Sequence, residues 1–163
     1  MLSLYGEPEH RFMVLPLKKL PSADSDRHIP TPHYASAYAS GMDLRANLSK
    51  AIMLESLDRV VVRTGVAIAI PNGFEAQVRP RSGLAAQSGL TVLNAPGTID
   101  ADYRGEICVI MVNLSRTTQI IEPDQRIAQL VFAPVVPVSF DEVSSLPTVD
   151  GNRAGGLGST GSF

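Results

Sequence analysis

Short runs of apolar residues, many of them β-branched, recur along the chain and are separated by polar or glycine- and proline-containing turns. Runs of this length and composition predict β-strands. We expect strands at residues 13–17, 59–62, 66–70, 74–78, 90–93, 107–112, 127–132 and 135–138.

Two of these runs indicate how the strands are covered. Within 74–78, Phe74, Ala76 and Val78 alternate with polar residues, as in a strand with one buried face. Every residue of 107–112 is apolar, so both faces of that strand should be covered, by a second sheet or by another subunit. This combination favours a sandwich or a closed barrel.

A single helix is expected. Residues 81–88 are rich in alanine, leucine and glutamine, follow Pro80 and end before Gly89, a residue suited to a helix C-terminus. The sequence contains neither an internal repeat nor a strand-helix-strand alternation, which disfavours a doubly wound α/β fold. The pattern therefore predicts an all-β fold with one short helix.

Composition and charge limit the number of domains and the kinds of partner that the chain could bind. A length of 163 residues suits one domain, and a charged fraction of only 18% suggests hidden surface. A subunit interface explains that fraction most simply, although many uncharged polar residues would give the same figure. The net charge of −2 disfavours a nucleic-acid or membrane partner held by general attraction. One cysteine and no apolar stretch of membrane-spanning length lead us to expect a soluble, cytoplasmic protein.

The two ends of the chain differ from its middle. We expect one domain over residues 1–149, with a polar extension at 1–11 and a polar, proline-containing loop at 20–36. Residues 150–163 are rich in glycine and carry only Leu157 and Phe163 as large apolar residues. Burial alone cannot order such a segment, so we expect a flexible lid that another part of the assembly orders.

Two segments in the first half carry candidate polar chemistry. Residues 39–46 form a small-residue turn that leads Asp43 into a strand, where capping of the turn is the ordinary explanation of such an aspartate. Residues 79–84 bring Arg81, Ser82 and Gly83 to the start of the helix, where free N–H groups and the helix dipole favour an anion. A phosphate site and an ordinary helix start are both open at this stage.

The segment 93–106 is longer than a connecting hairpin loop needs to be, which suggests a pocket wall. Backbone groups of Thr98 and Ile99 could read a base from its strand-like edge. Asp100 could take a proton from water, and the alternative is a solvated turn aspartate. The sequence assigns no role to Asp102.

Two further segments follow. Arg126 and Gln129 stand out among the apolar residues of 126–132. The tail combines glycines with Ser159 and Thr160, but it has no lysine before the hydroxyls and no room for a following helix, which excludes a P-loop. We interpret it as a lid over a phosphate chain, which a neighbouring subunit could provide.

No metal-ligand spacing is found in the sequence. His10, His28 and His33 all lie in the polar N-terminal region, and we expect them to be solvated. The nucleophile-elbow and zinc-protease patterns are also missing from the sequence. Hydrolysis by water, without a covalent intermediate, fits what remains.

With these segments in this order, the chain resembles the homotrimeric dUTPase family from residue 15 to residue 161. The strongest matches are Arg-Ser-Gly-Leu at 81–84, Pro-Gly-Thr-Ile-Asp at 96–100 with Tyr-Arg-Gly-Glu at 103–106, and Arg-Ile-Ala-Gln-Leu at 126–130. The resemblance implies a jelly-roll-like distorted β-barrel that forms a trimer with active sites at the subunit boundaries. It also implies hydrolysis of dUTP to dUMP and pyrophosphate, which limits uracil incorporation into DNA and supplies dUMP for dTMP synthesis.

The resemblance implies roles for the residues of the nucleotide site. Asp100 would orient and deprotonate the water that attacks the α-phosphorus, and Tyr103 would stack under the deoxyribose and exclude a 2′-hydroxyl. The uracil edge would be bound by Asn94 and by backbone groups of Thr98, Ile99 and Cys108. The phosphates would be held from a second subunit by Arg81, Ser82 and Gly83.

Magnesium is the implied cofactor. Triphosphate oxygens and waters would hold it without direct protein ligands, with Asp43 and Gln129 as water-mediated support. From a third subunit, Arg153 would clamp the γ-phosphate while the lid contributes its remaining contacts through Leu157, Gly158, Ser159 and Thr160. The implied partners are dUTP and two further copies of the chain.

Three positions depart from the family pattern. The tail is one residue shorter between its arginine and the Gly-Gly pair, which places Asn152 where the arginine is expected and leaves Arg153 to reach from the next position. Leu157 stands where an aromatic residue usually covers uracil, which predicts a KM that is raised more than kcat is lowered. Tyr38 replaces a usual glycine, with no consequence that the sequence predicts.

Two other functions are compatible with parts of the sequence. A dCTP deaminase shares the fold but needs a glutamate that activates water for attack on cytosine, whereas the hairpin offers Asp100. A non-hydrolysing nucleotide sensor would explain the altered tail as a sign of lost catalysis. Pyrophosphate release from dUTP, compared between the wild type and Asp100→Asn, separates the sensor from the enzyme.

Overall fold

The computed structural model describes residues 13–23 and 28–150. Within these residues the chain forms eleven strands and one short helix, which confirms the all-β class. The elements in chain order are β1 (Leu17–Lys19), β2 (Met42–Arg45), β3 (Ile52–Leu54), β4 (Arg59–Arg63), β5 (Val66–Ile68), β6 (Phe74–Arg79), α1 (Ser82–Ser88), β7 (Leu90–Val92), β8 (Gly97–Ile99), β9 (Cys108–Asn113), β10 (Gln119–Ile121) and β11 (Arg126–Pro134).

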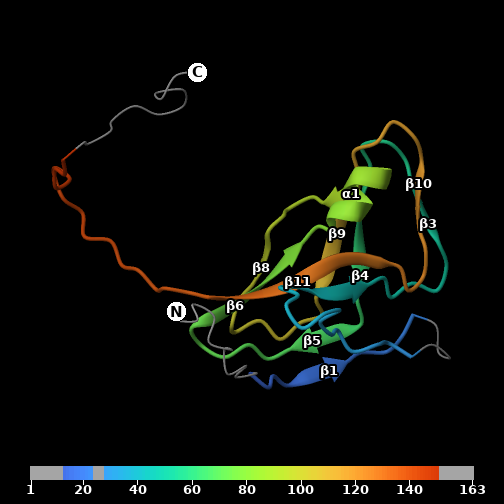
Figure 1. The fold of residues 1–163 in the computed structure, drawn as a ribbon, viewed down its shortest axis with the longest axis horizontal. Helices are drawn as coiled ribbons and strands as arrows, with labels where there is room; N and C mark the ends of the chain where they lie inside the picture. The colour runs from blue at the N-terminus through green and yellow to red at the C-terminus, as the bar shows by residue number, and fades with distance from the viewer. Residues whose placement is uncertain (1–12, 24–27, 151–163) are drawn as a thin grey trace, which may run out of the picture.

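The strands form small antiparallel sheets arranged as a jelly-roll-like, distorted barrel (Figure 1). The largest sheet has the order β2-β11-β6-β8, and a second has the order β4-β9-β7. In addition, β1 pairs with β5 and β10 pairs with β3. In Figure 1, β11 crosses the middle of the molecule, α1 lies at the top and the β3–β10 pair forms the right-hand edge.

The core lies between the sheets and takes inward-facing residues from most strands. Its largest fully buried side chains include Leu44, Leu90, Ile107, Met111, Ile121 and Ile127. On β9, Val109 and Met111 are fully buried, whereas Cys108 and Ile110 on the other face are half-buried. The inner face of this apolar run is therefore covered as predicted, and its outer face is only partly covered within one chain.

The helix begins and ends as its sequence predicts. Arg81 precedes α1 in an extended conformation, and Gly89 closes the helix with a φ of 67° and an N–H that donates to the Ala85 carbonyl at 3.0 Å. Glycine favours this left-handed conformation because it lacks a Cβ. A Cβ at residue 89 would also lie 2.8 Å from the backbone nitrogen of Ser115, so the glycine lets α1 lie close to the segment after β9.

Two strand predictions are wrong at the ends of the fold. Residues 135–138 form no strand, because β11 ends at Pro134 and residues 135–150 leave the barrel as an extended arm (Figure 1). A strand needs a partner for its backbone groups, and no strand of the described residues pairs with this run. The first strand covers Leu17–Lys19 and not 13–17.

The described part of the loop expected at 20–36 packs against the barrel. Ile29 joins the core, and Tyr34 forms an isolated bridge with Met42. The extension at 1–11, residues 24–27 and almost all of the expected lid lie outside the described residues.

Candidate active site

Asp43 lies inside β2 and not in a capping turn, and its carboxylate binds two arginines. Its Oδ1 is 2.9 Å from Nε of Arg81, and its Oδ2 is 3.2 Å from Nη1 of Arg126. Arg81 also donates through Nη1 to the Arg126 carbonyl at 3.1 Å. The two arginines come from different elements, so this cluster joins β2, β11 and the segment before α1.

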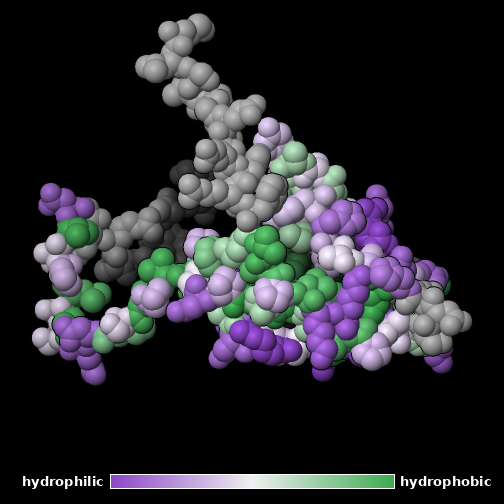
Figure 2. Space-filling view, turned by 90° about the horizontal axis from the view of Figure 1, so that it is seen from below, coloured by the Kyte–Doolittle hydropathy of each residue, from purple (hydrophilic) through white to green (hydrophobic). Residues whose placement is uncertain are grey.

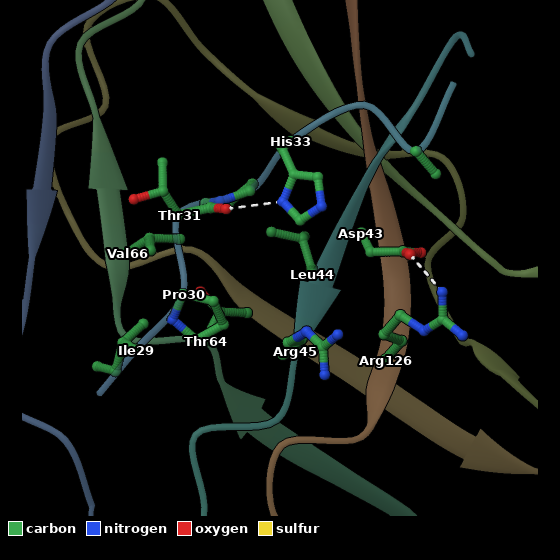
Figure 3. Close-up of a pocket in the computed structure, with 12 residues that line it drawn as sticks. Ile29, Pro30, Thr31, His33, Asp43, Leu44, Arg45, Thr64, Val66 and Arg126 are labelled. Carbon is green, nitrogen blue, oxygen red and sulfur yellow. Dashed lines mark hydrogen bonds and ion pairs between the residues drawn. The ribbon is translucent and has the colours of Figure 1, made fainter. Parts of the chain in front are cut away.

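A small pocket of about 70 Å³ lies beside this cluster (Figure 3). Asp43, Arg45 and Arg126 line one side, and residues 29–33 line the other. The ring Nδ1 of His33 lies 3.2 Å from the Thr31 carbonyl oxygen, and Nη1 of Arg45 binds Asp124 at 3.0 Å. His28 and His33 are both exposed, as the sequence predicts.

Gln129 connects this cluster to the start of the helix. In the sheet register it pairs with Asp43 on β2 and with Arg79 on β6, so the three side chains share one face of the sheet. Its Nε2 donates to the Pro80 carbonyl at 2.9 Å, which holds the junction between β6 and α1. Ser82 and Gly83 are exposed in the first turn of α1.

The segment 93–106 lies at the other end of the same sheet. Its strand β8 pairs with β6, with Thr98 opposite Gln77 and Ile99 opposite Ala76. Asn94 is exposed, and its Nδ2 would lie 3.1 Å from a Cβ on the buried Gly97, so its amide packs against the start of β8. The Ala95–Pro96 peptide bond is cis.

Asp100 follows β8 and begins a turn. Its side chain is exposed, and within the described residues it makes no hydrogen bond or ion pair. Its carbonyl accepts a hydrogen bond from the Tyr103 N–H at 3.1 Å. The carboxylate is therefore open to water, while its backbone is fixed on one side by β8 and on the other by the turn.

Tyr103 folds back over the end of the loop. Its hydroxyl donates to the Glu106 carbonyl at 3.0 Å, and its ring lies so close to Gly105 that a Cβ there would overlap it. Arg104 donates through Nη1 to the Ala101 and Tyr103 carbonyls at 2.6 and 2.8 Å. The loop is thus closed by its own contacts.

Cys108 opens β9 directly after this loop and pairs in register with Arg63. Burial and the nearby Glu106 carboxylate raise the pKa of the Cys108 thiol, and Arg63 opposes them. A thiol in this setting stays protonated at neutral pH, which suits a residue that offers backbone groups and not a nucleophile.

The sequence predicts Asp43, Arg81 and Gln129 as separate candidates, and the structure places them in one cluster. It places Asn94, Thr98, Ile99, Asp100 and Tyr103 in a second group on and beside β8, whereas Cys108 lies on β9 opposite Arg63 of β4. The structure adds two further residues, Arg126 and Glu106, that the sequence does not predict as site residues. Arg126 carried a signal, as a charge beside an apolar strand, whereas Glu106 carried none that distinguishes it from a solvated loop residue.

The described residues contain neither a metal-binding cluster nor a helix that could span a membrane. No group of three His, Cys, Asp or Glu side chains there could hold a metal ion. No helix there is long and apolar enough to span a bilayer. The candidate lid residues Arg153, Leu157, Gly158, Ser159 and Thr160 lie outside the described residues.

Comparisons with known proteins identify the family. The family model described as dUTPase matches residues 27–161. A deoxyuridine 5'-triphosphate nucleotidohydrolase of Wolbachia sp. subsp. Brugia malayi is 47% identical over 157 residues, which cover 96% of this chain and 99% of that protein. Another, of Aquifex aeolicus, is 54% identical over 123 residues, covering 76% of this chain and 80% of that protein.

Solved structures show the same fold. The dUTPase of Staphylococcus bacteriophage 80alpha, a mutant with dUpNHpp, gives a TM-score of 0.79 at 23% identity and covers 91% of this chain and 98% of its own. A mutant dUTPase from phage phi11 of S. aureus, which coordinates a structural Mg(II) ion, gives 0.73 at 20% identity over 83% of this chain and 100% of its own. With its family match spanning most of its length, this chain belongs to the dUTPase family.

Proposed function

We propose that the protein hydrolyses dUTP to dUMP and pyrophosphate. The observation that carries this proposal is the exposed carboxylate of Asp100, which stands at the end of β8 with no side-chain partner among the described residues. Asp100 takes a proton from water as the water oxygen bonds to the α-phosphorus. The bond from that phosphorus to the bridging oxygen breaks, and pyrophosphate leaves. A positioned general base of this kind contributes about 10²- to 10⁴-fold to the rate.

The base and the sugar are bound beside Asp100. Asn94 and the backbone groups of Thr98, Ile99 and Cys108 pair with the uracil edge, so a cytosine amino group would leave a buried donor unpaired. Tyr103 stacks under the deoxyribose and leaves no space for a 2′-hydroxyl. Support comes from the exposed Asn94 and Tyr103 side chains, which lie before and after Asp100 in one loop.

The phosphate-binding residues come from a second copy of the chain. Ile99 pairs with Ala76 near the start of β6, whereas Arg81 lies beyond the far end of that strand. At about 3.3 Å of rise per residue, the extended chain from Ala76 to Arg81 spans about 16 Å. Asp100 and Arg81 of one chain are thus too far apart to act on adjacent phosphates, and Arg81, Ser82 and Gly83 of a neighbour complete the site.

A trimer follows from this head-to-tail sharing when the ring closes after three copies. The arm at 135–150 gives further support, because Val136, Phe140 and Leu146 are 80%, 98% and 82% exposed. Figure 2 shows the arm projecting from the barrel and apolar residues gathered on the face seen from below. An apolar groove of about 710 Å³ includes Leu17, Ile68 and Phe132 among its lining residues. The arm of each subunit packs against this groove of the next.

Magnesium accompanies the substrate. Asp43 and Gln129 face each other across β2 and β11 and offer the hard oxygen atoms that this ion prefers. They would support the waters of a magnesium ion held by the triphosphate, and the ion would supply neutralisation of phosphate charge. Arg81, now paired with Asp43, turns to the phosphates when they bind.

The glycine-rich tail closes the site from a third subunit. Arg153 clamps the γ-phosphate, Ser159 and Thr160 donate hydrogen bonds, and Leu157 and Gly158 cover the nucleotide. The support is the sequence alone, because the segment has the glycines and hydroxyls that suit a phosphate chain.

Hydrolysis in ¹⁸O-labelled water tests the reaction. The wild-type protein with magnesium and dUTP should release dUMP and pyrophosphate, with the label in dUMP because water attacks the α-phosphorus. UTP should react far more slowly, and dCTP should yield neither dCMP nor deaminated product. Label in pyrophosphate, or absence of any release, would contradict the proposed function.

A further inference from the structure

Glu106 ends the loop that carries Asp100 and Tyr103, and its side chain is tied to a different part of the barrel. Its Oε2 accepts from Nε of Arg63 at 2.7 Å, and its Oε1 accepts from the Gly65 N–H at 2.7 Å. The carboxylate is only 14% exposed, whereas the Arg63 side chain is 51% exposed. Charge-assisted hydrogen bonds with this little exposure are among the stronger ones in proteins.

The segment that receives Glu106 is itself firmly held. The Arg63 carbonyl accepts from the Asn47 N–H at 2.8 Å, and the Gly65 carbonyl accepts from the Leu20 N–H at 2.8 Å. The buried Thr64 hydroxyl donates to the Ile107 carbonyl at 2.6 Å. Residue 106 is therefore anchored to the turn between β4 and β5, which cannot shift without disturbing the core.

The same residue holds the ring of Tyr103 through its backbone. The Tyr103 hydroxyl donates to the Glu106 carbonyl, and the ring lies against Gly105. Any movement of residue 106 therefore moves the ring. The Asp100 carbonyl accepts from the Tyr103 N–H, but Asp100 also directly follows β8, which is held by its pairing with β6, so its position depends less on this anchor.

We propose that Glu106, held by the Arg63–Gly65 turn, is a positioning residue that fixes the distance between the Tyr103 ring and the bound sugar. Because that distance decides whether a 2′-hydroxyl fits, Glu106 controls the discrimination between dUTP and UTP. This inference rests on the proposed function, in which the ring excludes a 2′-hydroxyl. If the Tyr103 ring can move away from the sugar by a fraction of an ångström, the ribose of UTP fits, while the water near Asp100 stays in place. Glu106 thereby acts on sugar selection more than on the chemical step.

The ratio of kcat/KM for dUTP to kcat/KM for UTP is the decisive measurement. In Glu106→Ala the ratio should fall about tenfold, the scale of one lost charge-assisted hydrogen bond. In the conservative Glu106→Gln, which still accepts from the Gly65 N–H, it should fall less. The kcat for dUTP should change less than the ratio does in both variants. Asp124→Asn, which removes the carboxylate of the separate Arg45–Asp124 pair, should leave the ratio unchanged.

Tyr103→Phe provides a second route if Glu106→Ala fails to fold, because it keeps the ring and removes only its bond to the Glu106 carbonyl. It should lower the ratio in the same direction. In a Tyr103→Ala background, Glu106→Gln should have no further effect on the ratio, since contacts that act through one group are not additive.

Equal loss of activity on dUTP and UTP in the Glu106 variants would overturn the inference, as would an unchanged ratio in Tyr103→Phe. Full additivity with Tyr103→Ala would also overturn it. A wild-type chain that releases no pyrophosphate from dUTP would instead contradict the proposed function, and this inference with it.

Discussion

The family resemblance places Leu157 where an aromatic residue is expected to cover the uracil. Leucine supplies apolar contact but no ring stacking, and an aromatic contact is typically worth about 0.5–1.5 kcal/mol beyond its area. Leu157→Phe should therefore lower KM for dUTP several-fold and change kcat much less. Steady-state kinetics measure both, with Leu157→Met as a control that keeps an apolar side chain without a ring. A KM that is the same in all three proteins would remove the idea.

Single residues also mark the limit of prediction from sequence. Asp43, Arg81 and Gln129 were recognised by type and motif, because an isolated carboxylate, a basic residue before a helix and an amide in an apolar strand are visible locally. Their mutual contacts were not predictable. Arg126 reaches Asp43 only because the β11–β2 register shifts between Arg126 and Ala128. Such a shift depends on the packing of both strands, which no local pattern encodes.

At the scale of single elements, the end of α1 depends on Gly89. A Cβ there would meet both a left-handed conformation and the Ser115 backbone. Gly89→Ala should therefore lower the free energy of unfolding by about 3 kcal/mol or more, measured by urea denaturation at fixed protein concentration.

Gly73→Ala is the matched control, because Gly73 has a φ of 85° but open space around its Cβ position. It should cost about 1 kcal/mol, the conformational penalty alone. Equal losses at the two positions would show that close packing of α1 on Ser115 does not matter for stability.

Elements with a strong local pattern were predictable, whereas the short strands β3 and β10 were not predicted although they pair with each other. The alternation at 74–78, the apolar run at 107–112 and the helix before Gly89 all lie within the observed β6, β9 and α1 or overlap them closely. Residues 135–138 include three valines, but Pro137 lacks a backbone N–H, and no strand of the described residues pairs with this run. Local composition reports what a segment favours, whereas pairing decides whether it forms a strand.

At the scale of the whole molecule, the exposed arm at 135–150 is the part of the fold that we expect to hold the subunits together. Phe140 is almost fully exposed in the single chain and would be costly to leave in water. We expect Phe140→Asp to shift the protein from a trimer to a monomer and to abolish dUTP hydrolysis, because each site of the proposed trimer takes residues from several subunits. Light scattering after size-exclusion chromatography gives the mass directly.

Phe140→Leu is the control for that variant, since it keeps an apolar side chain at the same position. It should remain trimeric and active. A trimeric, active Phe140→Asp would show that the arm makes no contact that assembly requires, and a monomeric, active wild type would refute the shared site.

The proposed reaction depends on the transfer of a proton from water to Asp100. Asp100→Asn keeps the shape of the side chain and removes its basicity, so kcat for dUTP should fall about 10²- to 10⁴-fold. Binding of a dUTP analogue with nitrogen between the α- and β-phosphorus atoms should stay within about threefold, since the carboxylate does not hold the substrate. A kcat for Asp100→Asn equal to that of the wild type would contradict the account.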